Sequence, residues 1–172
     1  MNKNSFFMQN VFKSVDILFF MIYNSVNTFL FCEDKFMQRK QARENAFMLI
    51  FESVCKSDET AEEIFSKATE LRGLEYDQYV TDVFFGAYEN AALLDEKMEK
   101  HLKGWKKERI SPVSLATLRL GCYEMLFMED IPAKVSINEA VELSKKYDDE
   151  KSYSFVNGVL NAVANEISAN EK

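Results

Sequence analysis

Apolar residues between Val80 and Leu102 recur at alternating spacings of four and three, and this pattern constrains the fold more than any other feature of the chain. The stripe consists of Val80, Phe84, Ala87, Ala91, Leu94, Met98 and Leu102. Residues at these spacings share one face of an α-helix, so we expect a continuous helix of about six turns. A stripe of this length normally packs against other helices, which predicts a helical bundle.

Signals for helix ends divide the rest of the chain after Met37 into further helices. We expect helices over 39–54, 60–72, 111–127 and 152–167, with Gly73 in the left-handed conformation at the end of the second. A further helix is expected to follow a break at 131–132 and to end at 147. Capping-box spacing occurs at Thr60 with Glu63 and at Ser136 with Glu139.

Two further starts are expected at Ser111 followed by Pro112, and at Ser152. The helix over 111–127 is apolar on more than one face, which predicts that it is the central, buried one. Strand-like alternation is scarce, and 172 residues include only 5 Gly and 2 Pro. The sequence therefore predicts an all-α fold, a compact single-domain bundle of about six to seven helices.

Residues 1–36 differ in composition from the rest: they lack Ala, Gly, Pro and Arg, yet contain more than half of the chain's 15 Phe. Such a composition is typical of AT-rich DNA translated without selection for a fold. We interpret 1–36 as an N-terminal extension, non-native or disordered, before a domain over 37–172. Two alternatives are an extra helix packed on the domain, and a membrane segment or signal peptide over 15–32, although polar residues such as Asp16 and Asn24 interrupt that run.

The charge and the reactive residues limit the classes of function. A net charge of -7 is atypical of a general nucleic-acid binder, so any RNA contact must come from a local basic patch. Cys32, Cys55 and Cys122 lack metal-site spacing and indicate buried or free thiols in a reducing compartment. His101, the only histidine, is expected to be a solvated helix-end residue. Without a catalytic motif, we expect neither an enzyme nor a metal or cofactor site.

A cationic cluster opens the first predicted helix. Arg39, Lys40 and Arg43 are spaced to share a helix face, and Phe51 follows two turns later. Cations that bind phosphates beside an aromatic ring that stacks on a base are typical of single-stranded RNA recognition. An alternative, in which Phe51 belongs to the core and the arginines only solubilise the helix start, fits these residues equally well.

Three short motifs carry a family resemblance: Ala42-Arg43-Glu44-Asn45-Ala46, Ile137-Asn138-Glu139-Ala140 and Phe155-Val156-Asn157-Gly158. An Asn–Gly pair within a helix costs roughly 1 kcal/mol at the glycine alone, so something other than helix propensity keeps it there. The three motifs, in this order and over about Met37 to Ile167, resemble the NusB family of bacterial transcription antitermination factors.

The resemblance implies a binding protein that recognises the boxA element of ribosomal-RNA leader transcripts. It implies an RNA site formed by Arg39, Lys40, Arg43, Phe51, Ser152, Phe155 and Asn157. It also implies a structural signature of Asn138, Glu139 and Gly158, in which Gly158 permits close helix contact. Residues 37–172 would then be a NusB-like helical RNA-binding domain.

The resemblance also implies partners: NusE, a basic ribosomal protein, and an antitermination complex with RNA polymerase in the cytoplasm, with a homodimer as a further possibility. Three residues depart from the family pattern. Gln41 interrupts the arginine-rich start, Met48 stands in place of Gln, and Asp148 stands in place of Gly. Two rival interpretations are a membrane-tethered or stand-alone helical interaction module without RNA binding, and the NusB-like domain of a ribosomal-RNA cytosine methyltransferase, which needs a following α/β domain.

Overall fold

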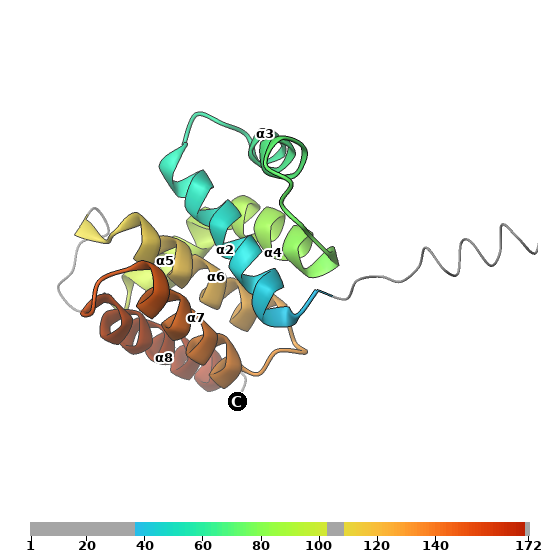
Figure 1. The fold of residues 1–172 in the computed structure, drawn as a ribbon. Helices are drawn as coiled ribbons and strands as arrows, with labels where there is room; N and C mark the ends of the chain where they lie inside the picture. Colours follow the sequence, from blue (N-terminus) through green and yellow to red (C-terminus); the bar gives the residue numbers. More distant parts are fainter. Residues whose placement is uncertain (1–36, 103–108, 171–172) are drawn as a thin grey trace, which may run out of the picture. The chain divides into compact units, whose positions relative to one another are not determined.

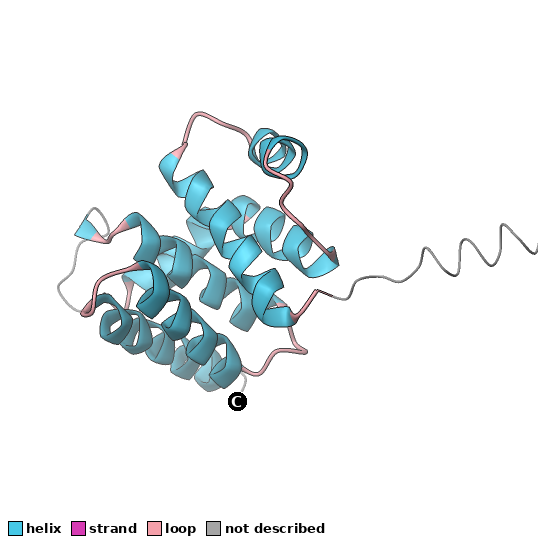
Figure 2. Ribbon diagram, viewed as in Figure 1, coloured by secondary structure: helices cyan, strands magenta, loops and turns pink. Residues whose placement is uncertain are grey.

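Helices account for every regular element in the computed structural model, which describes residues 37–102 and 109–170 (Figure 2). They are α2 (Arg39–Cys55), α3 (Ala61–Ser66), the π-helix η1 (Lys67–Leu71), α4 (Gln78–Glu89), α5 (Ala91–Glu99), α6 (Pro112–Phe127), α7 (Ala133–Tyr147) and α8 (Ser152–Asn170). The predicted all-α fold is confirmed. In these ranges no helix has the length and apolarity to cross a membrane; the run over 15–32 lies outside the described residues.

Helix α6 is the centre of the bundle, as its apolar pattern predicts. It packs against α2, α4 and α5 and also against α7 and α8 (Figure 1). Leu118, Leu120 and Cys122 are fully buried on it. A Cβ added to Gly121 would lie 2.9 Å from a methyl carbon of Leu160 and 3.5 Å from Cβ of Ala140. The glycine therefore lets α6 lie close to α7 and α8.

The long helix expected over 80–102 is broken at Asn90, so the prediction of one continuous helix was wrong. The side-chain Nδ2 of Asn90 donates to the backbone oxygen of Gly86 at 2.8 Å, and its backbone N–H donates to the same oxygen at 3.1 Å. Asn side chains compete in this way for helical acceptors, which favours a break. Most of the expected stripe is nevertheless core, from Val80 on α4 to Met98 on α5.

Predicted helix ends were confirmed where the cap is local. Thr60 and Glu63 form both bonds of a capping box, and Gly73 has φ +66°. The capping box expected at Ser136 is absent, because α7 begins three residues earlier at Ala133, directly after Pro132. Ser136 is instead a buried residue inside the helix.

Two aspartates organise the turn between α7 and α8. Asp149 Oδ1 accepts hydrogen bonds from the backbone N–H and the hydroxyl of Ser152, both at 2.9 Å, so Asp149 rather than Ser152 caps α8. Asp148 is extended (φ -123°, ψ -177°) rather than left-handed, so its replacement of Gly causes no backbone strain. Its Oδ2 accepts from the hydroxyls of Ser111 (2.7 Å) and Ser114 (2.6 Å), which ties the end of α7 to the start of α6.

These bonds predict a pH effect on stability. Burial alone would raise the pKa of Asp148, but hydrogen bonds from Ser111 and Ser114 outweigh it and the pKa is lowered. The contribution of the Asp148 carboxylate to the free energy of unfolding is therefore complete above its unfolded-state pKa of about 3.9. It is lost as pH falls through the lower folded-state pKa. Asp148→Asn should lower the free energy of unfolding at pH 7. Below about pH 4 the variant should then lose less further stability than the unaltered chain does. Urea unfolding across pH checks this, with exposed Asp130→Asn as the control; an unchanged pH profile would exclude the role.

Candidate nucleic-acid interface

Cationic side chains from α2 and α7 border a small cleft of about 130 Å³. The cleft is lined by Lys40, Arg43, Glu44, Glu139, Glu142, Leu143 and Lys146. Lys146 Nζ lies 2.5 Å from Glu44 Oε1, and the Tyr147 hydroxyl donates to the same oxygen. These two hydrogen bonds lower the pKa of Glu44 and connect the start of α2 to the end of α7. Lys40 and Lys146, far apart in sequence, thus face one cleft.

Arg43 does not present its guanidinium to solvent as the sequence suggested. Its side chain is 4% exposed; Nε lies 2.8 Å from Glu124 Oε1, and Nη1 lies 3.4 Å from Glu139 Oε2. The Tyr79 hydroxyl donates to the same oxygen of Glu124. Burial alone would lower the pKa of Arg43, but Glu124 and Tyr79 outweigh it and the pKa is raised. Arg43 is therefore a buried link between α2, α6 and α7.

Arg39 and Lys40, by contrast, are exposed at the start of α2. The Arg39 guanidinium lies 4.5 Å from the centre of the Tyr79 ring, and that of Arg43 lies 5.8 Å from it. Tyr79 is buried, and burial together with the Glu124 carboxylate raises its pKa. Because a cation over an aromatic face is attracted to it, Tyr79 holds Arg39 in place while leaving its outer side open.

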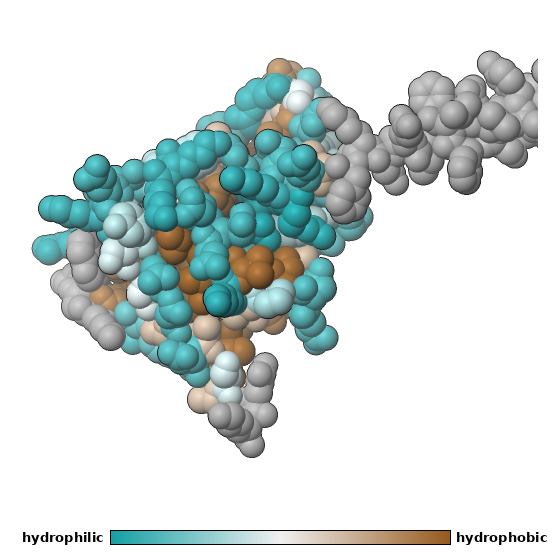
Figure 3. Space-filling view, turned by 60° about the horizontal axis from the view of Figure 1, so that its bottom comes forward, coloured by the Kyte–Doolittle hydropathy of each residue, from teal (hydrophilic) through white to brown (hydrophobic). Residues whose placement is uncertain are grey.

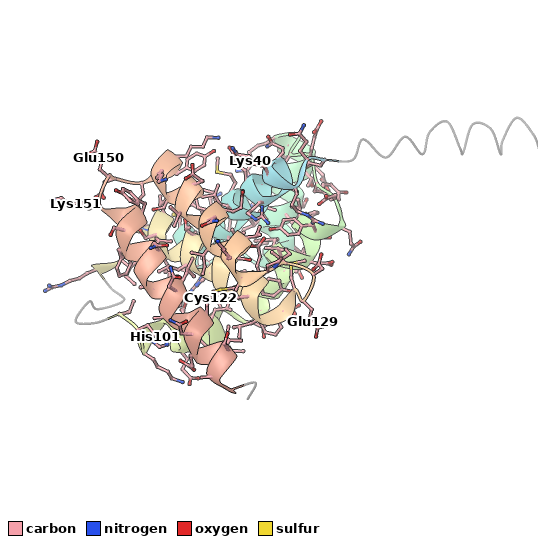
Figure 4. The ribbon with its side chains drawn as sticks, turned by 90° about the horizontal axis from the view of Figure 1, so that it is seen from below. Lys40, His101, Cys122, Glu129, Glu150 and Lys151 are labelled. Carbon is pink, nitrogen blue, oxygen red and sulfur yellow. The ribbon has the colours of Figure 1, made fainter. Side chains whose placement is uncertain are left out.

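Sequence reasoning missed three residues next to this cleft: Lys145, Lys146 and Tyr153. Lys145 Nζ lies 5.6 Å from the centre of the Tyr153 ring, which is 39% exposed. Figure 4 shows Lys40 on α2 and the α7–α8 turn, marked by Glu150 and Lys151, along the same side of the molecule. The lysine pair was visible in the sequence, but its place beside α2 was not. We call Arg39, Lys40, Lys145 and Lys146 the cationic edge.

Phe51 lies away from the cationic edge, in an apolar groove of about 480 Å³ that also includes Met48 and Leu74. Eight residues turn a helix by about 800°, which leaves Phe51 roughly 80° away from the direction of Arg43. Its half-buried ring stacks on Phe47, with ring centres 6.3 Å apart. The expected patch of Arg43 and Phe51 on one face is therefore not formed.

The start of α8 supplies the other residues expected at the RNA site. Phe155 is half-buried against the core, and Ser152 is bonded to Asp149. Asn157 is exposed, and its Oδ1 accepts from Nδ2 of Asn161 at 3.0 Å. The face turned forward in Figure 3 is mainly hydrophilic, with an apolar patch between the polar residues.

The three signature residues have different surroundings. Glu139 pairs with Arg43, which supports a structural role. Asn138 is exposed. Gly158 is also exposed, and a Cβ added there would meet nothing within 4 Å. The close helix contact expected at Gly158 is absent, so the reason for a glycine at this position does not lie within the described part of the chain.

The histidine is also less solvated than expected. His101 Nε2 lies 2.7 Å from Glu166 Oε2 and is half-buried, while Lys97 contacts the other oxygen of Glu166 at 3.2 Å. No group of three or more potential metal ligands occurs within 37–102 and 109–170. Cys55 is an exposed free thiol and Cys122 a buried one, as the sequence indicates.

Sequence comparison relates this chain to proteins of known family. The NusB family model matches residues 40–165. The chain is 41% identical to the transcription antitermination protein NusB of Bacillus licheniformis over 131 residues, which cover 76% of this chain and 99% of that protein. It is 41% identical to the protein of the same name from Clostridium acetobutylicum, covering 79% of this chain and all of the relative.

Solved structures agree with this relationship. NusB of T. maritima matches with a TM-score of 0.66 and 34% identity, covering 76% of this chain and 92% of that one. A structure of the antitermination factors NusB and NusE in complex with dsRNA matches with a TM-score of 0.66 and 30% identity, covering 74% and 96%. With most of its length matched in sequence and in fold, the chain belongs to the NusB family.

Proposed function

We propose that this chain is a transcription antitermination protein that binds boxA-type RNA together with NusE and contacts the RNA through the cationic edge. It acts in the cytoplasm by binding, without turnover, as part of a complex with RNA polymerase. Support comes from its NusB relatives and from its likeness to a structure in which NusB and NusE are in complex with dsRNA. The observation that carries the proposal is that exposed cations from α2 and α7 meet at one cleft.

Electrostatics favour this edge as the contact surface. The chain carries a net charge of -7, so phosphates are attracted only where cations gather. Arg39 and Lys40 are exposed there, and Tyr153 offers an exposed ring beside Lys145. Stacking of a base on such a ring contributes roughly 1–3 kcal/mol. Ser152, Phe155 and Asn157 lie on the same helix as Tyr153 and extend the proposed surface.

Arg43 has a supporting role in this proposal. Its guanidinium is occupied by Glu124 and Glu139, so it stabilises the start of α2 rather than binding phosphate. Phe51 is assigned to the neighbouring apolar groove. Residues 37–172 form the RNA-binding domain in this proposal, and the extension 1–36 is not required for it.

Charge removal at the edge tests the proposal. Arg39→Gln with Lys40→Gln should weaken binding of a boxA RNA in the presence of NusE. It should also reduce the slope of log K against log salt by about 0.7 for each cation that contacts a phosphate of single-stranded RNA. Fluorescence anisotropy titrations from low to moderate salt measure both quantities.

The matched control is Lys100→Gln with Arg109→Gln, which removes the same charge at exposed positions outside the edge. An equal loss of RNA affinity in both double variants would mean that the effect comes from the net charge of the chain and not from the cationic edge. Unchanged affinity and slope in the edge variant would remove Arg39 and Lys40 from the interface. Failure of the unaltered chain to bind RNA with NusE present would favour the alternative of an interaction module without RNA binding.

A further inference from the structure

Gly158 lies on the exposed face of α8, and the described part of the chain gives no reason for a glycine there. Its neighbours Ser154, Asn157 and Asn161 are exposed as well. Among the described glycines a positive φ occurs only at Gly73, so the backbone conformation of Gly158 suits any residue. A Cβ added to Gly158 would meet nothing within 4 Å. Neither backbone conformation nor packing within the described residues therefore requires this glycine.

The other two helical glycines of the described chain differ from Gly158 in this respect. A Cβ added to Gly86 would lie 2.0 Å from Oη of Tyr123, and one added to Gly121 would lie 2.9 Å from a methyl carbon of Leu160. Both glycines make room for a side chain of the protein. Glycine is a poor helix former, because it loses more backbone entropy on folding than other residues. At Gly158 this cost brings no internal contact, which leaves the space above it open to a ligand.

The charge of α8 favours an anionic ligand on this face. Between Ser152 and Asn170 the only charged residue is Glu166, and His101 and Lys97 bind its carboxylate. Helix faces turned to solvent normally carry several charged side chains. In a chain with a net charge of -7, a face without carboxylates is one of the places that do not repel phosphate.

Polar and aromatic side chains next to Gly158 suit an unpaired nucleotide. Nδ2 of Asn161 donates to the backbone oxygen of Asn157 at 2.7 Å and to its Oδ1 at 3.0 Å. These bonds occupy Oδ1 of Asn157 and leave its Nδ2 group as a donor on the exposed face. Tyr153, one turn earlier, has an exposed ring beside Lys145. A ring for stacking, an amide donor for a base edge and a bare stretch of helix therefore lie close together on α8.

We propose that Gly158 is an RNA contact, at which the ribose-phosphate backbone of one nucleotide lies directly against α8. Successive helical residues are about 100° apart, so Gly158 lies further round the exposed face than Asn157. Without a side chain it lets another backbone come closest to the helix. The neighbouring base stacks on Tyr153 and accepts a hydrogen bond from Asn157. Figure 4 shows α8 running on from the α7–α8 turn, which lies on the same side as Lys40, so RNA at the cationic edge continues onto this face. The identity of the ligand rests on the proposed function.

Larger residues at position 158 should change stability and RNA affinity in opposite directions. Gly158→Ala should raise Tm by roughly 3–5 °C, because alanine is the better helix former and its Cβ meets no neighbour. Gly158→Leu should not lower Tm, since leucine is also a good helix former. Binding of a boxA RNA with NusE present should nevertheless weaken several-fold with alanine and on the order of tenfold with leucine, because the added side chain separates the RNA from α8.

Thermal melting by circular dichroism gives Tm, and fluorescence anisotropy titrations give the RNA affinity. The slope of log K against log salt should stay unchanged, because no cation is removed. The matched control is Ala169→Leu, which adds a large side chain at an exposed position about three turns further along the same side of α8. It should bind RNA like the unaltered chain.

Unchanged RNA affinity in Gly158→Leu would overturn this assignment while leaving RNA binding at the cationic edge intact. A loss of NusE affinity measured without RNA would assign Gly158 to the protein partner and overturn the RNA contact. A dimer that Gly158→Leu dissociates, seen by light scattering, would assign the position to a second copy and likewise overturn it. If the unaltered chain binds no RNA with NusE present, the proposed function itself fails.

Discussion

Replacing Glu124 by Leu is expected to destabilise the fold by about 3–5 kcal/mol, because it leaves the Arg43 charge buried without its main partner. Glu124 is fully buried and Arg43 is 4% exposed, so water cannot take over from the missing carboxylate. Glu139 is the other carboxylate near Arg43, at 3.4 Å, and is itself partly solvated. The Tyr79 hydroxyl loses its acceptor as well. Guanidinium chloride unfolding measures the free energy directly.

A double variant separates the ion pair from the burial of its side chains. Arg43→Met with Glu124→Leu removes both charges together, and buried pairs replaced by apolar residues often cost little. We expect a remaining loss of about 1–3 kcal/mol from the unpaired Tyr79 hydroxyl, less than from Glu124→Leu alone. If the two single losses simply add in the double variant, Arg43 and Glu124 are not coupled and the buried link is incorrect.

The second large effect is expected at Phe47, where substitution by Ala should cost about 3–5 kcal/mol. Its side chain is 1% exposed and lies between two rings, with Phe51 at 6.3 Å and Tyr147 at 5.2 Å between centres. It therefore joins α2 to the end of α7, the two helices that line the cleft between Lys40 and Lys146. Thermal and urea unfolding of Phe47→Ala give the stability change.

Phe51→Ala is the matched comparison, because it removes the same ring four residues later on the same helix. Phe51 is only half-buried at the apolar groove, so its loss should cost clearly less stability than that of Phe47. RNA titrations of Phe51→Ala with NusE then show whether this ring serves binding as well. Equal destabilisation by both variants would make Phe51 a core residue, as the alternative interpretation of the sequence held.

Helix ends were predictable where a few neighbouring residues satisfy each other's backbone groups. Thr60 with Glu63, Gly73 and Ser111 each form the local structure that their spacing indicates. The two predictions of helix boundaries that were wrong, at Asn90 and Ser136, also have local causes. Asn90 breaks a stripe whose apolar period is otherwise continuous, and Ser136 has capping spacing but lies within a helix that starts after Pro132.

The candidate site was less predictable, because helical spacing defines a face of a helix but not what covers that face. Arg43 shares a face with Arg39 in sequence, yet Glu124, 81 residues later, takes its guanidinium into the core. Lys146, 102 residues after Glu44, reaches the start of α2 only because α7 packs there. Neither pairing leaves a signal in a single sequence.

The three motifs in the sequence carry the resemblance to the NusB family. Periodicity and capping residues in the sequence alone determined the all-helical class and the central place of α6. Those features depend on hydrogen bonds and apolar spacing within a few turns of one helix. Which arginine is buried and which lysines form the cationic edge depended on packing between helices. The free energy of burying or exposing a charge is set by neighbours that the chain brings together only when it folds.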